Sequence, residues 1–262
     1  MEFKMVKQDI WIFTGSEFNA NAILILNNDE AVLVDGLASR ADAIELREII
    51  SKTFKTKVTY IISTHYFSDH MAAFSLFPES KIIAHKNYLH TFTSELFRSE
   101  EERARFVEPS IVFDSCLQLK WGIYLLNIFH NPGHTLSTVA IDIEAADLII
   151  TGDHVFGNLA YLCYSTPEMI REALNRIHMT KRSIVITGHN GIASMDKIND
   201  GLGYLERLER YVKEARVHNS EQLILNIKIE DCVKPKVNIT EPERIFHQRN
   251  LQLIIDKGLF SK

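Results

Sequence analysis

Short runs rich in Ile, Val and Leu recur along the 262-residue chain, separated by longer amphipathic stretches. Apolar runs of this length, bounded by polar or turn residues, are typical of strands that are buried on both faces. Such strands need helices outside them, so the pattern predicts an α/β protein. The predicted strands are Ile10–Phe13, Ala22–Leu26, Ala31–Val34, Val58–Ser63, Lys81–Ala84, Ile123–Phe129, Thr138–Ile143, Asp147–Thr151 and Ser183–Thr187.

The amphipathic stretches carry apolar residues at helical spacing. The clearest start signal is Thr166-Pro167-Glu168, which combines an N-cap residue, a proline at the first helical position and an acid in the first turn. The predicted helices are Ser39–Phe54, Asn87–Phe106, Thr166–His178, Gly203–Val217 and Glu241–Lys257.

The predicted strands gather in residues 10–84 and again in residues 111–187. This predicts two β-rich halves packed face to face, with helices outside. We expect one domain over residues 1–218. Residues 219–262 are predicted to be a C-terminal extension, a strand at Gln222–Glu230 followed by a helix, packed on that domain or on a partner. The extension is also the predicted surface for a homo-oligomer.

Charge and cysteine content narrow the function classes. The net charge of −5 argues against a protein that binds nucleic acid or a membrane surface through basic residues. Charges interrupt the N-terminal residues, and no apolar run approaches the ~20 residues that span a bilayer. Three distant cysteines give no disulfide framework and no C-x-x-C motif. We therefore expect a cytoplasmic protein.

Histidine and aspartate residues follow several predicted strands directly. The strand Val58–Ser63 runs into Thr64-His65-Tyr66-Phe67-Ser68-Asp69-His70. Strand ends can hold several ligands rigidly around one point, and imidazole with carboxylate is a donor set for zinc and similar ions. The sequence therefore predicts a metal site. Its candidate ligands are His65, Asp69, His70, His134, Asp153 and His189.

These motifs resemble the metallo-β-lactamase fold hydrolases, a family with H-x-H-x-D-H, P-G-H-T, G-D and G-H motifs in that order. The chain has His65-x-Phe67-x-Asp69-His70, Pro132-Gly133-His134-Thr135, Gly152-Asp153 and Gly188-His189, and Val34-Asp35-Gly36 is similar to the family's early VDxG motif. The resemblance implies a four-layer αβ/βα sandwich of two mixed β-sheets flanked by helices.

The resemblance also implies how the metals would be held. One site keeps Asp69, His70, His189 and a shared Asp153, so it is complete. The other keeps His65, His134 and Asp153, because Phe67 stands where the family has a second histidine. We expect zinc, as one or two ions, with the His65 and His134 site weakened. Iron and manganese are the alternatives, since two histidines and one carboxylate also suit non-haem Fe(II).

The implied function is a metal-dependent hydrolase that uses a metal-activated water on a small ester, thioester or lactone. Asp69 is the predicted catalytic residue as well as a ligand. Asp153 stands where one large group of β-lactamases has cysteine, so the chain is similar to the glyoxalase-II-like and general hydrolase branches, and we do not expect antibiotic hydrolysis. Two alternatives stay open: a mononuclear non-haem iron oxygenase or redox enzyme using His65, His134 and Asp153, and a non-catalytic metal-binding or assembly protein.

Other residues near the motifs are candidate neighbours of the site. Tyr66, Phe67, His130 and His154 are predicted to contact the ligands or to line a substrate pocket. The remaining histidines are expected to be ordinary surface residues: His85, His90, His178, His218 and His247. A small-molecule substrate is the expected partner.

Overall fold

The computed structural model describes residues 1–95, 99–218 and 220–261. The chain divides into two compact units. The two-sheet unit comprises Met1–Asn131, Leu136–Gly152 and Arg182–Ala193, and the helical unit comprises Pro132–Thr135, Asp153–Lys181 and Ser194–Lys262. The predicted domain boundary between residues 218 and 219 does not coincide with the boundaries of these two units, and it stays a prediction.

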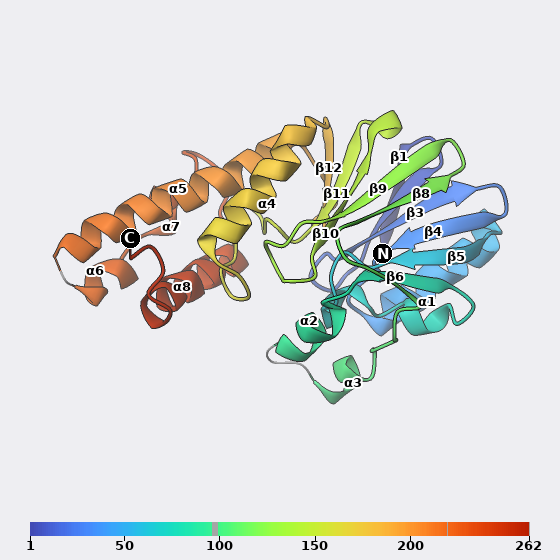
Figure 1. The fold of residues 1–262 in the computed structure, drawn as a ribbon, viewed down its shortest axis with the longest axis horizontal. Helices are drawn as coiled ribbons and strands as arrows, with labels where there is room; N and C mark the ends of the chain where they lie inside the picture. The colour runs from blue at the N-terminus through green and yellow to red at the C-terminus, as the bar shows by residue number, and fades with distance from the viewer. Residues whose placement is uncertain (96–98, 219, 262) are drawn as a thin grey trace. The chain divides into compact units, whose positions relative to one another are not determined.

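The first sheet of the two-sheet unit is mixed (Figure 1). Its strands lie side by side in chain order, antiparallel from β1 to β4 and parallel from β4 to β7. The parallel part brings the carboxyl ends of neighbouring strands to one edge, where polar loops follow them. The strands are β1 (Glu2–Lys7), β2 (Ile10–Thr14), β3 (Asn21–Asn27), β4 (Glu30–Val34), β5 (Lys57–Ile62), β6 (Lys81–His85) and β7 (Ile111–Phe113).

The second sheet is mixed as well. Its order is β13-β12-β11-β10-β9-β8, and only the β11–β12 pair is parallel. The strands are β8 (Cys116–Trp121), β9 (Tyr124–His130), β10 (Val139–Ile143), β11 (Leu148–Gly152), β12 (Ile184–Thr187) and β13 (Ile192–Ala193).

Strand β3 shows how both faces of the first sheet are buried. Ile23 and Ile25 belong to an apolar core shared with the second sheet, whereas Ala22 and Leu24 belong to a second core shared with helix α1. Successive side chains of a strand point to opposite faces, so a continuous apolar run fills two cores. The Trp121 indole N–H also donates to the carbonyl of Ile25 at 2.9 Å. The predicted α/β sandwich of two mixed sheets with helices outside is confirmed.

The helices of the two-sheet unit are mostly short. Helix α1 is capped by Ser39 and continues into the π-helix η1, as the predicted helix Ser39–Phe54 requires. The predicted helix Asn87–Phe106 is instead two short helices, α2 and α3, and its residues Leu96, Phe97 and Arg98 lie outside the described residues. The elements are α1 (Arg40–Ile49), η1 (Ile50–Phe54), η2 (Ser68–His70), η3 (Phe74–Leu76), α2 (Tyr88–Ser94), α3 (Glu100–Arg103) and η4 (Glu144–Ala146).

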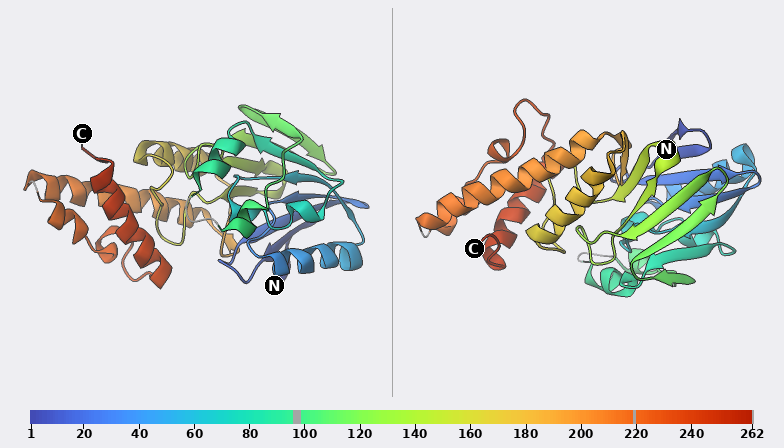
Figure 2. Two further views of the ribbon diagram at one scale, coloured as in Figure 1. Left: turned by 90° about the horizontal axis from the view of Figure 1, so that it is seen from below. Right: turned by 45° about the horizontal axis from the view of Figure 1, so that its top comes forward.

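The helical unit contains α4 and α5, which pack against each other (Figure 2), and a C-terminal group of shorter helices. Helix α4 begins after Thr166, whose hydroxyl accepts from the amide of Met169, as predicted. The predicted strand Gln222–Glu230 is wrong, because the structure has α6 and α7 there. The helices are α4 (Pro167–Thr180), α5 (Met195–Val217), α6 (Glu221–Leu225), α7 (Ile229–Cys232) and α8 (Glu241–Asp256).

Among the helices that the structure describes, none combines the length and the apolar character needed to cross a membrane.

Candidate metal centre

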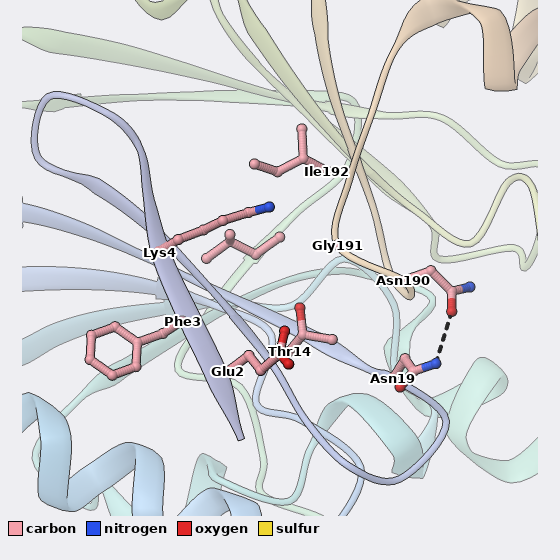
Figure 3. A pocket seen from close by; sticks show the side chains of 9 residues that line it. Glu2, Phe3, Lys4, Thr14, Asn19, Asn190, Gly191 and Ile192 are labelled. Atoms are coloured by element: carbon pink, nitrogen blue, oxygen red, sulfur yellow. Dashed lines mark hydrogen bonds between the residues drawn. The ribbon is translucent and has the colours of Figure 1, made fainter.

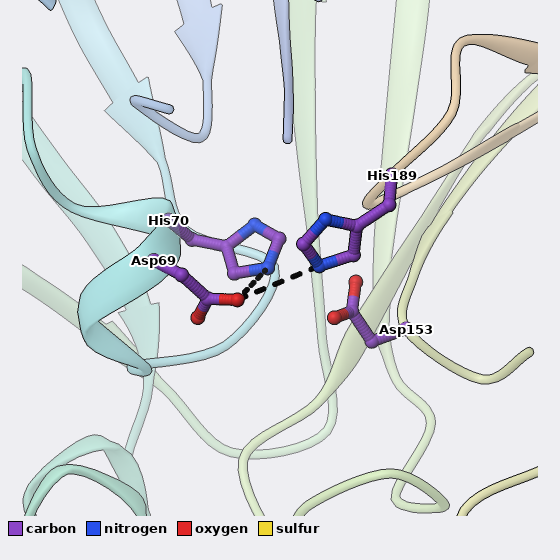
Figure 4. Close-up of side chains that lie close together, drawn as sticks. All are labelled: Asp69, His70, Asp153 and His189. Carbon is purple, nitrogen blue, oxygen red and sulfur yellow. Dashed lines mark ion pairs between the residues drawn. The ribbon is translucent and has the colours of Figure 1, made fainter. Parts of the chain in front are cut away.

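The first group of candidate ligands consists of Asp69, His70, Asp153 and His189 (Figure 4). Each offers one ligand atom, and these atoms lie within 4.8 Å of one another. A carboxylate oxygen of Asp69 lies 3.7 Å from Nε2 of His70 and 3.5 Å from Nε2 of His189. Both imidazoles are buried, and Asp69 is about one quarter exposed. The structure therefore brings together the residues predicted for the complete site.

The second group consists of His65, His134 and Asp153, whose ligand atoms also lie within 4.8 Å of one another. His65 follows β5 and is buried, and its Nδ1 lies 3.1 Å from the hydroxyl of Thr64. The ring centres of His65 and His70 are 4.4 Å apart. These are the residues that were predicted for the weakened site.

The donor chemistry of both groups fits a zinc-like ion. Zinc binds nitrogen and oxygen ligands at about 2.0–2.2 Å, so two ligand atoms on one ion lie within roughly 4.4 Å of each other. The separations in the two groups are close to that limit. Imidazoles mixed with carboxylates favour zinc or iron over magnesium or calcium, which prefer oxygen ligands alone. The first group offers two histidines and two aspartates, and the second offers two histidines and one aspartate.

The Asp35 carboxylate lies beside the His70 ring, and the sequence motifs gave it no role in the site. It follows β4 with a positive φ of 57° and its carboxylate accepts from the amide and the hydroxyl of Thr64 at 2.8 and 2.7 Å. The same carboxylate lies 3.3 Å from Nδ1 of His70. A carboxylate at one ring nitrogen fixes the orientation of a ligating histidine and raises its basicity. The available signal was its position in Val34-Asp35-Gly36, directly after a buried strand.

His189 and its loop are held by residues 18–21, which lie just before and at the start of β3. Its Nδ1 lies 2.9 Å from the carbonyl oxygen of Phe18, which turns Nε2 toward Asp69. The backbone of Ala20 forms a β-bridge to His189. The buried side chain of Asn21 donates to the carbonyl of Thr187 at 2.8 Å and accepts from the amide of Gly191 at 3.1 Å. The loop that presents His189 is thus fixed by the start of β3.

A close approach at Gly152 explains the glycine before Asp153. Gly152 has a positive φ of 60°, and a Cβ there would lie 2.9 Å from the Thr64 hydroxyl. Any larger residue would strain the backbone and push against the residue next to His65. The G-D motif therefore has a steric reason as well as a chemical one.

Phe67 and Tyr66 belong to packed clusters. Phe67 is 6% exposed, and its ring meets the His65 ring edge-on at 5.2 Å. It therefore occupies space beside His65, where the family motif has a second histidine. Tyr66 is buried, donates its hydroxyl to the carbonyl of Val107, and packs on Tyr88. Burial raises the pKa of the Tyr66 hydroxyl. The structure does not bring Tyr66 into either ligand group.

His130 and His154 lie near the loop that carries His134. Nε2 of His130 lies 2.9 Å from the carbonyl oxygen of Leu136, and its ring stacks on His85 at 3.7 Å. His154 is buried, and a Cβ on Gly133 would lie 2.8 Å from its ring. Direct roles for both histidines at the metal ligands stay predictions.

Two histidines expected at the surface are buried. His85 is 1% exposed, and burial together with the charge of His130 lowers its pKa to about 4. His247 is also 1% exposed, with Nδ1 2.9 Å from the Tyr204 hydroxyl and Nε2 2.9 Å from the carbonyl oxygen of Ile227. The expectation of ordinary surface histidines was wrong at these two positions, because helical and strand spacing alone does not reveal such polar partners.

A cavity of about 330 Å³ opens beside the loop that follows His189 (Figure 3). None of the candidate ligands lines it, although Asn190 comes directly after His189. The side-chain amide of Asn19 donates from Nδ2 to Oδ1 of the Asn190 side chain at 3.1 Å across this opening. The lining residues are Glu2, Phe3, Lys4, Ile12, Thr14, Asn19, Asn190, Gly191 and Ile192.

Comparison with known proteins places these observations in one family. The model of the family described as the metallo-beta-lactamase superfamily matches residues 15–189. Among curated proteins, the metallo-beta-lactamase type 2 of Bacillus cereus is 24% identical over 159 residues, and that of Bacillus sp. (strain 170) is 26% identical over 159 residues. Each alignment covers 58% of this chain and 59% of the relative, so the chain spans about three-fifths of these relatives' length.

Solved structures share the fold at low sequence identity. The metallo-beta-lactamase from Pontibacter korlensis has a TM-score of 0.67 at 15% identity, covering 78% of this chain and 98% of its own. The stereoselective inverting sec-alkylsulfatase from Pseudomonas sp. has a TM-score of 0.75 at 12% identity, covering 99% of this chain and 50% of its own. At these identities the likeness establishes the fold alone.

Proposed function

The chain belongs to the metallo-beta-lactamase superfamily, and on that premise we propose that it is a metal-dependent hydrolase acting on a small ester, thioester or lactone. The observation that carries the proposal is the group formed by Asp69, His70, Asp153 and His189. Members of the superfamily are typically metal-dependent hydrolases, and this group keeps every ligand of the complete site that the family resemblance implies.

The residues of this group have distinct proposed roles. A bound zinc-like ion would lower the pKa of water to about 7 and polarise a substrate oxygen. Asp69 would orient the attacking water and accept its proton, since its carboxylate is partly exposed and lies close to both imidazoles of the group. Asp35 and the carbonyl of Phe18 would keep the Nε2 atoms of His70 and His189 directed at the ion.

The two metal positions would be unequal. Phe67 cannot bind a metal, so the His65, His134 and Asp153 group has one imidazole fewer than the family motif implies. Protein purified without added metal should then hold about one equivalent of tightly bound zinc. Phe67→His should raise the bound metal toward two equivalents. Two tightly held equivalents in the unaltered protein would contradict this part of the proposal.

The substrate class is tested with a panel of hydrolase substrates. Apoprotein is reloaded with zinc, manganese or iron and assayed on small esters, thioesters and lactones, on a β-lactam, and on a secondary alkyl sulfate. The sulfate ester is included because the likeness to the sec-alkylsulfatase covers 99% of this chain. We expect turnover of an ester, thioester or lactone, at most trace activity on the β-lactam, and loss of turnover of about 10²-fold or more in Asp69→Asn. Metal binding without turnover of any panel substrate would overturn the hydrolase proposal.

The second candidate function is a mononuclear iron oxygenase, which the two histidines and one carboxylate of the second group favour. Iron retained on purification, with oxygen consumption abolished by His134→Ala, would support it over the hydrolase.

We further propose a cytoplasmic location. A homo-oligomer through the C-terminal extension is a further proposal, which sedimentation of the full chain would test.

A further inference from the structure

We propose that the C-terminal helix α8 positions the segment that begins with Asp153, and that Asn250 is a positioning residue for it. The inference rests on the proposed function in one respect, since it takes Asp153 as a metal ligand. All contacts that carry it lie within the helical unit, between residues 153–165 on one side and helices α5 and α8 on the other.

The side chain of Asn250 binds the backbone of this segment like an added peptide group. Its Oδ1 accepts from the amide of Leu162 at 2.9 Å, and its Nδ2 donates to the carbonyl of Ala160 at 2.8 Å. Asn250 is fully buried, so water cannot replace these hydrogen bonds. Its Nδ2 also lies 3.0 Å from the Tyr204 hydroxyl, which in turn contacts His247. One carboxamide therefore links α8, α5 and the segment.

Glu243 makes a second attachment about two turns earlier on α8. Its carboxylate is 2% exposed and accepts from the amide and the side chain of Asn158, each at 2.7 Å. A Cβ on Gly157 would lie 2.3 Å from the same carboxylate oxygen, so only glycine leaves room for it. The other oxygen completes the capping box with Thr240 at the start of the helix. At the far end, Lys257 donates to the carbonyl of Cys163 at 2.7 Å.

The attachment reaches close to Asp153 itself. Residues 156–159 form a tight turn with two backbone hydrogen bonds between Phe156 and Leu159. Val155, two residues after Asp153, packs so closely on α5 that a Cβ on Gly201 would lie 2.2 Å from it. Near the end of the segment, the ring centre of Tyr164 lies 6.2 Å from that of His134. The backbone from Val155 to Cys163 is therefore held by α5 and α8, and this held stretch begins two residues after Asp153.

The experiment compares Asn250→Ala with Gln252→Ala, a matched control on the exposed side of the same helix. Zinc affinity is measured by competition with a chromogenic chelator, the ligand field by the visible spectrum of cobalt-loaded protein, and the segment by hydrogen exchange of peptides covering residues 153–165. We expect Asn250→Ala to speed exchange in this segment, to alter the cobalt spectrum, and to lower zinc affinity about 10–100-fold, the usual effect of losing a partner outside the ligands. Gln252→Ala should match the unaltered protein in all three.

A purely structural role would give a different result. Asn250→Ala would then lower the melting temperature of apoprotein and zinc-loaded protein equally, with unchanged zinc affinity and cobalt spectrum, and the proposal would be overturned. Should Asn250→Ala not fold, Lys257→Ala removes only the bond to Cys163 and must still speed exchange near residue 163. The two proposals can fail separately. If Asn250→Ala lowers zinc affinity but the unaltered zinc-loaded protein hydrolyses nothing in the panel, the hydrolase proposal is refuted and the positioning role of Asn250 stands.

Discussion

At the scale of single residues, the candidate centre depends on groups that hold the ligands as much as on the ligands. His70 and His189 each use one ring nitrogen for a protein partner, Asp35 or the carbonyl of Phe18, and present the other toward Asp69. Fixing a ring in this way removes conformational freedom before any ion binds. The strand-end motifs identify the ligands, but they do not show that Asp35 and the carbonyl of Phe18 are partners of His70 and His189, because these pairs are distant in sequence.

Replacing Asp35 by asparagine tests the partner of His70. The amide keeps the shape of the side chain and an acceptor for Thr64, but it loses the negative charge beside Nδ1 of His70. We expect zinc affinity to fall about 10–100-fold. The free energy of unfolding of the apoprotein should fall by less than the free energy of zinc binding does. Asp29→Asn, at an exposed turn residue, is the control. Unchanged affinity in a chelator competition would mean that Asp35 serves the fold only.

His85 predicts how stability depends on pH. Its pKa is lowered to about 4, first by burial and then by the charge of His130. The unfolded chain, with a histidine pKa near 6.5, binds the proton more readily than the folded chain. The contribution of His85 is therefore fully present above pH 6.5 and is lost as the pH falls from about 6.5 to about 4. His85→Phe should flatten this part of a urea-unfolding profile, whereas the exposed His90→Gln should not. Identical slopes in all three proteins would refute the assignment.

At the scale of elements, apolar runs and capping signals predicted the buried strands and the long helices. They missed β1, β7, β8 and β13, the four edge strands of the two sheets, which are too short or too polar to form a continuous apolar run of strand length. They also predicted a strand at Gln222–Glu230, where Leu225, Ile227 and Ile229 alternate with polar residues. Burial of Ile224 and Ile229 in the helical unit outweighs that local preference.

Two glycines of α5 should respond oppositely to alanine. A Cβ at Gly201 would lie 2.2 Å from Val155, whereas a Cβ at Gly203 would meet only the mobile end of the Arg207 side chain at 3.0 Å. Alanine favours a helix over glycine by about 1 kcal/mol, and overpacking a core costs about 1–3 kcal/mol. We expect Gly203→Ala to stabilise by roughly 0.5–1 kcal/mol and Gly201→Ala to destabilise by roughly 1–2 kcal/mol. Denaturant midpoints measure both, and equal effects would contradict the packing at Val155.

At the scale of the whole molecule, the order of motifs along the chain predicted the family, the two-sheet architecture and the two ligand groups. The division into a two-sheet unit and a helical unit was not predicted. The reason is that the loop at Pro132–Thr135 and the segment from Asp153 pack with helices that come much later in the chain. Spacing within a motif carries no information on such long-range packing.

Metal binding should be visible as global stability. A ligand that binds only the folded state stabilises it by about 2.7 kcal/mol at a concentration of 100 times its dissociation constant. We expect zinc to raise the melting temperature and a chelator to lower it. Asp69→Asn should lose most of this response, while Asp142→Asn, which weakens the ion pair with Arg182, should keep it. An equal zinc response in Asp69→Asn and the unaltered protein would exclude Asp69 as a ligand.

The hydrogen bonds of Asn21 have a consequence for folding kinetics. They join the start of β3 to the loop around His189 across a sequence separation of 166 residues at Thr187. During synthesis, at ~5–20 residues per second, the early strands must therefore wait for β12 before this loop can close. Contacts of such high contact order form slowly. The chain should consequently acquire its strands first and its metal-binding competence last, with nascent chains that end before residue 189 unable to retain zinc at the complete site.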